Sequence, residues 1–265
     1  MATSLSLGYD AIGDLEVLPD GKILVVDAID DANGQRRIFT ARYDTNGNLD
    51  STFGSGGVAI APVQPRSAVG GSMALQSDGG IVVTSHFSNG TDFDIRLVRF
   101  TASGQWDTTF GASGIVTLDL GGNETSNWGV VQADDKIVVA GTASGDSLIA
   151  RFLPDGTLDP SFGTGGLAIN SSSTGPRDGF GGLVLQTDGA IVAVGTATSI
   201  RGSVSELDFL VARYLGDPIA PSFLASEASA TPTMFDATEA DFTLLATEWL
   251  QPAKKKNRVR MVVAQ

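Results

Sequence analysis

The residues best placed for chemistry are arginines and aspartates that recur along the chain at a fixed spacing. In three copies an aspartate stands eight residues after the arginine. An arginine and an aspartate held across a turn form an ion pair that orders the turn. We therefore expect structural pairs, and the alternative is a ring of arginines that binds an anion. The pairs are Arg42 with Asp50, Arg99 with Asp107 and Arg151 with Asp159, and a fourth arginine is Arg213.

One turn in the first copy has features of a calcium loop. Side-chain oxygens stand at alternate positions of this turn, at Asp44, Asn46, Asn48 and Asp50. Calcium loops share this alternation, but they are completed by a distal glutamate that this segment lacks. A plain turn is therefore the first expectation, and calcium binding is the alternative. No other metal and no cofactor is expected.

The other reactive side chains fit turns and strands better than catalysis. The chain has no cysteine, which excludes disulfides, thiolate metal sites and cysteine nucleophiles. His86 is the single histidine, and it follows a strand-like run outside any recognisable nucleophile elbow. Asp134 and Asp135 are adjacent carboxylates, but an aspartate matching Asp134 occupies the same turn in every copy. We therefore expect no enzyme activity and no catalytic residue.

Short strands in four repeats would position these residues. A turn with aspartate at 20, 78, 134 and 188 recurs at steps of 58, 56 and 54 residues. Asp-Gly between two apolar runs predicts a hairpin. The apolar run after each turn does not alternate with polar residues, so both faces of that strand are expected to be buried. A strand ending in Arg and an aromatic residue, a Phe-Gly motif and a short strand complete the repeat.

Four antiparallel strands per repeat predict an all-β fold of consecutive β-propeller blades. Blades stacked on one another would bury both faces of their central strands. The four expected repeats are about 7–60, 61–118, 119–170 and 171–218. A linker at 219–234 and a helix with a basic tail at 235–265 are expected to follow them.

The C-terminal tail has three interpretations. Residues 236–250 carry an apolar stripe at helical spacing and end before Pro252, which predicts a short helix. In the second interpretation, Val259–Val263 adds a strand to an incomplete blade and closes the ring. In the third, the tail serves export or anchoring, because Lys254–Lys256 could touch anionic lipid.

With these motifs in place, the chain resembles the delta-60 repeat family, bacterial β-propeller-like repeats of unknown function. The resemblance rests on Leu-Asp-x-x-Phe-Gly with a following Gly, on Gln-x-Asp-Gly-x-Ile-Val and on Ala-Arg-Tyr/Phe, which together cover about residues 7–218. It implies an exported or cell-surface protein and no particular activity. Two features depart from the pattern: four repeats are few for a closed ring, and the last Phe-Gly motif is degraded at Asp217–Phe223.

Charge and hydropathy restrict the possible partners. The net charge of −13 opposes binding to nucleic acids and to anionic membranes. No apolar run is long enough for a transmembrane helix. Met1–Leu7 has neither the basic nor the apolar region of a signal peptide, so none is expected within this chain.

We expect a non-enzymatic scaffold or binding module that presents blade-end loops to a protein or glycan partner. The segments that differ most between repeats mark the preferred face, and they are Asp27–Arg37, His86–Asp92 and Thr196–Leu207. One alternative is a propeller hydrolase or lyase that acts on carbohydrate with carboxylates from several blades. Another is a fragment of a longer array, whose open blade edges would favour self-association.

Overall fold

The structure is a computed structural model that describes most of the first four-fifths of the chain. The described residues are 13–30, 36–62, 68–69, 71–170, 178–201, 204–215 and 259–264. The predicted helix at 236–250 therefore lies outside the described residues. The described part contains no helix with the length and apolar character that crossing a membrane requires.

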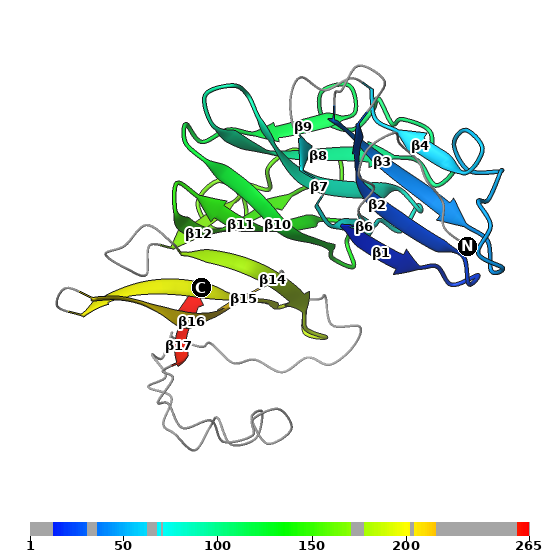
Figure 1. The fold of residues 1–265 in the computed structure, drawn as a ribbon. Coiled ribbons are helices and arrows are strands. Elements are labelled where there is room, and N and C mark those ends of the chain that lie inside the picture. Colours follow the sequence, from blue (N-terminus) through cyan, green and yellow to red (C-terminus); the bar gives the residue numbers. More distant parts are fainter. Residues whose placement is uncertain are drawn as a thin grey trace.

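The described elements are β-strands that form four sheets in chain order (Figure 1). The first sheet consists of β1 (Asp14–Val17), β2 (Ile23–Asp30), β3 (Arg36–Tyr43) and β4 (Val58–Ile60). The second consists of β5 (Ala68–Val69), β6 (Met73–Leu75), β7 (Ile81–Ser88), β8 (Phe93–Phe100) and β9 (Ile115–Leu118), and both β5 and β6 pair with β7.

The third sheet consists of β10 (Glu124–Val131), β11 (Ile137–Ala143), β12 (Asp146–Phe152) and β13 (Leu167–Asn170). The fourth consists of β14 (Gly179–Leu185), β15 (Ile191–Arg201), β16 (Val204–Tyr214) and β17 (Val259–Ala264). Each sheet follows the chain order of its strands, as propeller blades do. The all-β, propeller-type fold predicted from the sequence is confirmed.

The last strand bears on one interpretation of the tail, that residues 259–263 add a strand to a blade and close the ring. β17 pairs with β16 in parallel, with Val259 opposite Phe209 and Ala264 opposite Tyr214. The corresponding outer strands β4, β9 and β13 are antiparallel to their neighbours. Residues 259–264 thus supply a strand to the fourth sheet, but the described strands do not join the fourth sheet to the first. Among the described strands, the first and fourth sheets lie at opposite ends of the array (Figure 1).

Each sheet has two ends with different connections. The turn end carries the Asp-Gly turns, and the hairpin end carries the connections β2–β3, β7–β8, β11–β12 and β15–β16. Gly21, Gly79 and Gly189 have φ between 80° and 84° at the turn end, and Asp135 has 64° in the third copy. Glycine adopts this conformation without strain, and aspartate is among the few other residues that tolerate it.

Apolar clusters between successive sheets hold the array together. Val83 and Phe100 belong to the cluster between the first two sheets, Val139 and Phe152 to the next, and Phe180 to the last. In the second and third sheets, the central strands β7 and β11 are buried on both faces. Burial of this kind is what the uninterrupted apolar runs predicted.

The fourth sheet departs from the prediction that both faces of its apolar run are buried. Ile191 and Ala193 face the third sheet, whereas Val194 points away from it and is exposed. Four apolar side chains on this outer face are 49% to 64% exposed: Val184, Val194, Leu207 and Phe209. An apolar run predicts a buried strand only where a further layer covers it, and no described strand packs on this face.

Candidate functional site

The structure brings the recurring arginines to carboxylates at the turn end. The contacts run from Arg42 Nε to Asp50 Oδ2 at 2.9 Å, from Arg151 Nε to Asp159 Oδ2 at 2.8 Å, and from Arg99 Nη1 to Asp107. In the fourth sheet, Arg213 Nη2 instead lies 2.6 Å from Asp188 Oδ2 in the Asp-Gly turn. Each guanidinium therefore joins segments of its own blade.

Hydroxyl and amide donors hold the paired aspartates in the charged form. Thr52 donates to Asp50 Oδ1 from its hydroxyl at 2.6 Å and from its backbone N–H at 3.0 Å. These bonds, with Lys22, hold the pKa of Asp50 well below its usual range. Burial alone would raise the pKa of Asp107, but donors on Thr109 and the charge of Arg99 lower it overall.

We expect acid to remove the stabilisation that these carboxylates provide. A pKa below the unfolded value of about 3.9 means that the folded state binds protons less readily than the unfolded state. The stabilisation is therefore present above pH about 4 and is lost as the pH falls through the folded pKa. Urea unfolding at pH about 6 and at pH about 3 measures this effect. Between these two pH values, the free energy of unfolding of Asp107→Asn should fall less than that of the parent protein. Gln105→Ala changes an exposed residue that does not ionise, so it is the control and should lose as much as the parent. Equal losses in all three proteins would contradict this prediction.

The candidate calcium turn uses its aspartate to close the turn. Asp44 Oδ1 accepts hydrogen bonds from the N–H groups of Asn46 at 2.9 Å and Asn48 at 2.8 Å. Asp50, at the end of the segment, faces Arg42 and Lys22. The turn geometry accounts for these side chains, and calcium binding there stays the untested alternative.

His86 and Asp135 are both engaged in contacts between sheets. Nδ1 of His86 lies 3.4 Å from the Ser126 carbonyl oxygen. The His86 and Phe93 rings pack edge to face, with their centroids 5.7 Å apart. Burial lowers the pKa of His86, which favours the neutral imidazole. Asp135 accepts a hydrogen bond from the Ser77 N–H at 2.6 Å and so links the turn ends of the second and third sheets.

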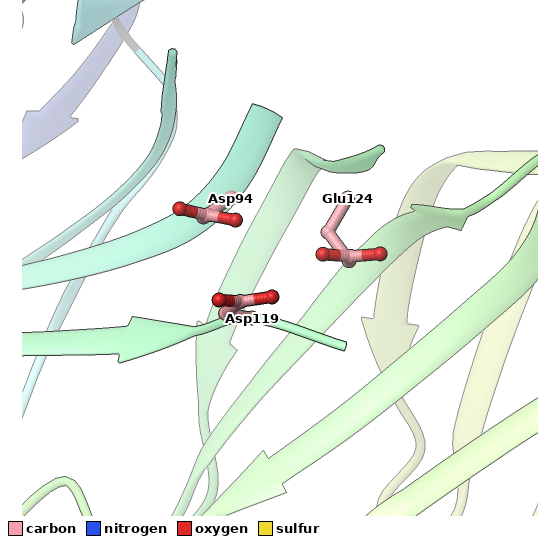
Figure 2. Close-up of side chains that lie close together, drawn as sticks. All are labelled: Asp94, Asp119 and Glu124. Atoms are coloured by element: carbon pink, nitrogen blue, oxygen red, sulfur yellow. The ribbon is translucent and has the colours of Figure 1, made fainter. Parts of the chain in front are cut away.

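A carboxylate cluster that sequence reasoning missed lies at the hairpin end, between the second and third sheets. Asp94 in β8, Asp119 after β9 and Glu124 in β10 point toward one another (Figure 2). One carboxylate oxygen from each lies within 4.8 Å of the others. Asp94 is 3% and Glu124 0% exposed, whereas Asp119 is exposed. Burial raises the pKa of both Asp94 and Glu124, and the neighbouring carboxylates add to the rise. The Asn89 hydrogen bond and the charge of Arg96 offset only part of the rise at Asp94.

The sequence marks one member of this cluster by its recurrence, although it does not show that the three carboxylates meet. An aspartate stands five residues before the recurring arginine in the last three repeats, at Asp94, Asp146 and Asp208. Asp178 directly precedes β14, the first strand of the fourth sheet, and Glu124 is the first residue of β10, the first strand of the third. Acidic residues therefore recur at the hairpin end, although only one interface gathers three of them within 4.8 Å among the described residues.

A groove of about 420 Å³ lies at the hairpin end between the third and fourth sheets. Asn127, Thr142 and Thr196 contribute polar side chains to its lining, and Gly179 and Gly181 contribute backbone. The lining also includes one carboxylate, the buried Asp178. The Asn127 side chain is fixed, because its Nδ2 donates to the carbonyl oxygen of Phe180 at 2.7 Å. The arrangement offers amide, hydroxyl and backbone groups to a ligand of modest size.

The segments expected to be variable loops are mostly extended hairpins. Thr196–Arg201 belongs to β15 and Val204–Leu207 to β16, and His86–Ser88 belongs to β7. Of the segment 27–37, residues 31–35 lie outside the described residues. Strand pairing therefore stiffens the candidate binding face more than loops would.

The repeats match a β-propeller family model. Its description is "Domain of unknown function (DUF5122) beta-propeller", and it matches residues 18–53, 76–110 and 132–162. Each matched segment runs from the turn end through the Phe of the Phe-Gly motif, in one of the first three repeats. The match supports propeller-type repeats and agrees with the four sheets.

Other comparisons add little. One solved structure, titled "Crystal structure of glucose dehydrogenase", has a TM-score of 0.42 and 12% identity over 74% of this chain. The chain spans 60% of that structure's length. A likeness this slight carries no argument about activity. No curated protein matches the chain.

Proposed function

We propose that the chain is a non-enzymatic repeat scaffold that binds a glycan or a protein segment at the hairpin end of its sheets. The observation that carries the proposal is the groove between the third and fourth sheets. The turn end is occupied by internal contacts such as Arg151 with Asp159 and Ser77 with Asp135. The hairpin end instead offers polar groups around a hollow.

The lining of the groove suits a neutral, hydroxyl-rich ligand. Thr142 and Thr196 provide hydroxyls, and Asn127 provides an amide that Phe180 holds in place. The carboxylate of Asp178 also lines the groove, but it is buried and accepts a hydrogen bond from the Thr198 N–H at 2.8 Å. Such groups exchange hydrogen bonds with sugars without requiring charge. A net charge of −13 disfavours an anionic glycan. A neutral oligosaccharide is therefore the first ligand to test, and an uncharged or basic peptide is the second.

Gly181 gives a way to fill the groove without straining the fold. A Cβ at this position would meet no atom within 4 Å. We expect Gly181→Trp to fold normally and to weaken oligosaccharide binding at least about tenfold, because the indole would occupy space that the ligand needs. Binding to an array of defined neutral oligosaccharides, followed by calorimetry on the tightest ligand, measures the effect.

A matched substitution at the other end of the sheets controls this experiment. Ala133 is exposed in the turn between β10 and β11 at the turn end. Ala133→Gln should bind as the parent protein does. Oligosaccharide binding that Gly181→Trp leaves unchanged, or that Ala133→Gln weakens equally, would contradict the placement of the site.

A carbohydrate-active hydrolase is a second candidate because three carboxylates converge at Asp94, Asp119 and Glu124. Glycosidases use two carboxylic groups that flank the bond to be cleaved. The burial of Asp94 and Glu124 weighs against this role, since a general acid must reach its substrate. Release of reducing ends from the bound oligosaccharide, abolished in Glu124→Gln, would favour the hydrolase.

We also propose that these are delta-60-type repeats of an exported or cell-envelope protein of a bacterium. Support comes from the motifs Leu-Asp-x-x-Phe-Gly and Gln-x-Asp-Gly-x-Ile-Val. Fractionation of cells that produce the full-length protein tests the location, and recovery in the cytoplasm would contradict it.

A further inference from the structure

The carboxylate cluster joins two successive sheets, the second and the third. Asp94 is the second residue of β8, and Asp119 directly follows β9, so both belong to the second sheet. Glu124 is the first residue of β10 and belongs to the third sheet. Figure 2 shows the three carboxylates converging from these separate elements. Any group held between them would fasten the two sheets at the hairpin end.

Each carboxylate has one oxygen engaged by a hydrogen bond. Asp94 Oδ2 accepts from Asn89 Nδ2 at 3.1 Å, and Glu124 Oε2 accepts from the Leu120 N–H at 3.1 Å. Asp119 Oδ1 accepts from the Gly121 N–H at 2.8 Å. These bonds fix the orientation of the three groups, as outer contacts do for metal ligands.

The remaining oxygens of the two buried acids have no hydrogen-bond partner. They are Asp94 Oδ1 and Glu124 Oε1, and both are shielded from solvent. A buried carboxylate oxygen without a partner is unfavourable, and it is more so when other carboxylates lie beside it. Hydrogen bonding thus orients these side chains but leaves their inward atoms unsatisfied. A bound cation would satisfy them.

The chemistry of the ligands selects a hard cation. All three side chains offer oxygen, and the chain has no cysteine to favour a softer metal. Calcium takes oxygen ligands at about 2.4 Å, so two ligands on opposite sides of one ion are about 4.8 Å apart. The spacing within 4.8 Å fits such a shell. Water can complete the shell on the side of Asp119, which is exposed.

We propose that Asp94, Asp119 and Glu124 form a calcium site that links the second and third sheets. The ion neutralises negative charge that Arg96 offsets only in part at Asp94, and it supplies a partner to both unsatisfied oxygens. It also fixes the connection 119–124 and the start of β8, beside the β7–β8 turn. This proposal does not depend on a glycan or protein partner, because the site lies between the second and third sheets and the groove between the third and fourth.

Calorimetric titration of the chelator-treated full chain with CaCl₂ tests the proposal. We expect one ion per chain, with a dissociation constant below about 1 mM. At about 10 mM CaCl₂, the melting temperature should rise by about 5 °C over its value in EDTA. No binding heat and no rise in melting temperature would overturn the proposal, as would an equal response to MgCl₂.

Three variants separate a metal ligand from a merely structural acid. Glu124→Gln and Asp119→Asn should each weaken calcium binding at least about tenfold and remove the calcium-dependent rise in melting temperature. In EDTA both should melt no lower than the parent protein, because each removes charge from a crowded cluster. Glu16→Gln, at an exposed position on β1, is the control and should respond to calcium as the parent does. A full calcium response in Asp119→Asn and Glu124→Gln would overturn the assignment.

Discussion

Replacing Arg151 with methionine is expected to lower the free energy of unfolding by about 3–5 kcal/mol. Arg151 is 1% exposed and has the largest side chain among the fully buried residues that the structure describes. Its guanidinium lies 4.8 Å from the Phe162 ring centre, and Nη2 donates to the Ser161 hydroxyl at 3.1 Å. Methionine would fill much of the volume but would leave the buried Asp159 without its closest cation. Lys136 Nζ, at 3.5 Å from Asp159 Oδ2, offsets only part of that loss.

Arg213 provides the matched control because it occupies the same column of the repeat in a wetter setting. Its side chain is 30% exposed, and its partner Asp188 is more exposed still. Exposed ion pairs contribute little to stability, since water screens them. Arg213→Met should therefore change the urea midpoint far less than Arg151→Met. If the two variants lost equal stability, the buried pair could not be the reason for the large effect.

Replacing Gly141 with alanine is expected to destabilise the fold by about 3 kcal/mol. A Cβ at residue 141 would lie 1.8 Å from the Thr125 carbonyl oxygen on the paired strand β10. The strands would have to separate, which would disturb the ladder and the neighbouring bulge between Ser126 and Trp128. The effect is large because backbone, unlike the end of a flexible side chain, cannot move aside cheaply.

A glycine allows the same close approach of two backbone segments in the second and fourth sheets. A Cβ at Gly195 would lie 1.9 Å from the Gly179 carbonyl oxygen, and one at Gly71 would lie 1.6 Å from that of Thr84. Gly181→Ala is the control, because a Cβ there meets nothing within 4 Å. Urea unfolding should show a near-neutral Gly181→Ala beside a strongly destabilised Gly141→Ala. A tolerated Gly141→Ala would mean that the strands are not held so closely.

The features that repeat within one blade were predictable from the sequence. The fixed step from Arg99 to Asp107 places both residues at the turn end, where the chain reverses once between them. The turn at Asp78 follows from its Asp-Gly pair between apolar runs, and glycine there has φ of 80°. Such relations are local, so spacing alone determines them.

The features that depend on how blades meet were not predictable. Asp94 and Glu124 are separated by thirty positions and two turns, and their contact depends on how the third sheet packs on the second. The pairing of β17 with β16 depends equally on a distant segment. The exposure of Phe209 depends on what lies beyond the fourth sheet, and hydrophobic periodicity contains no information about that.

Hydrogen exchange of the chain with and without its tightest oligosaccharide tests the central claim, that the hairpin end binds the partner. We predict slower exchange in peptides that line the groove, around Asn127, at 142–146 and at 178–182. Exchange at the Asp-Gly turns should stay the same. Slowing confined to those turns, with none around the groove, would contradict the account and place the binding surface at the opposite end.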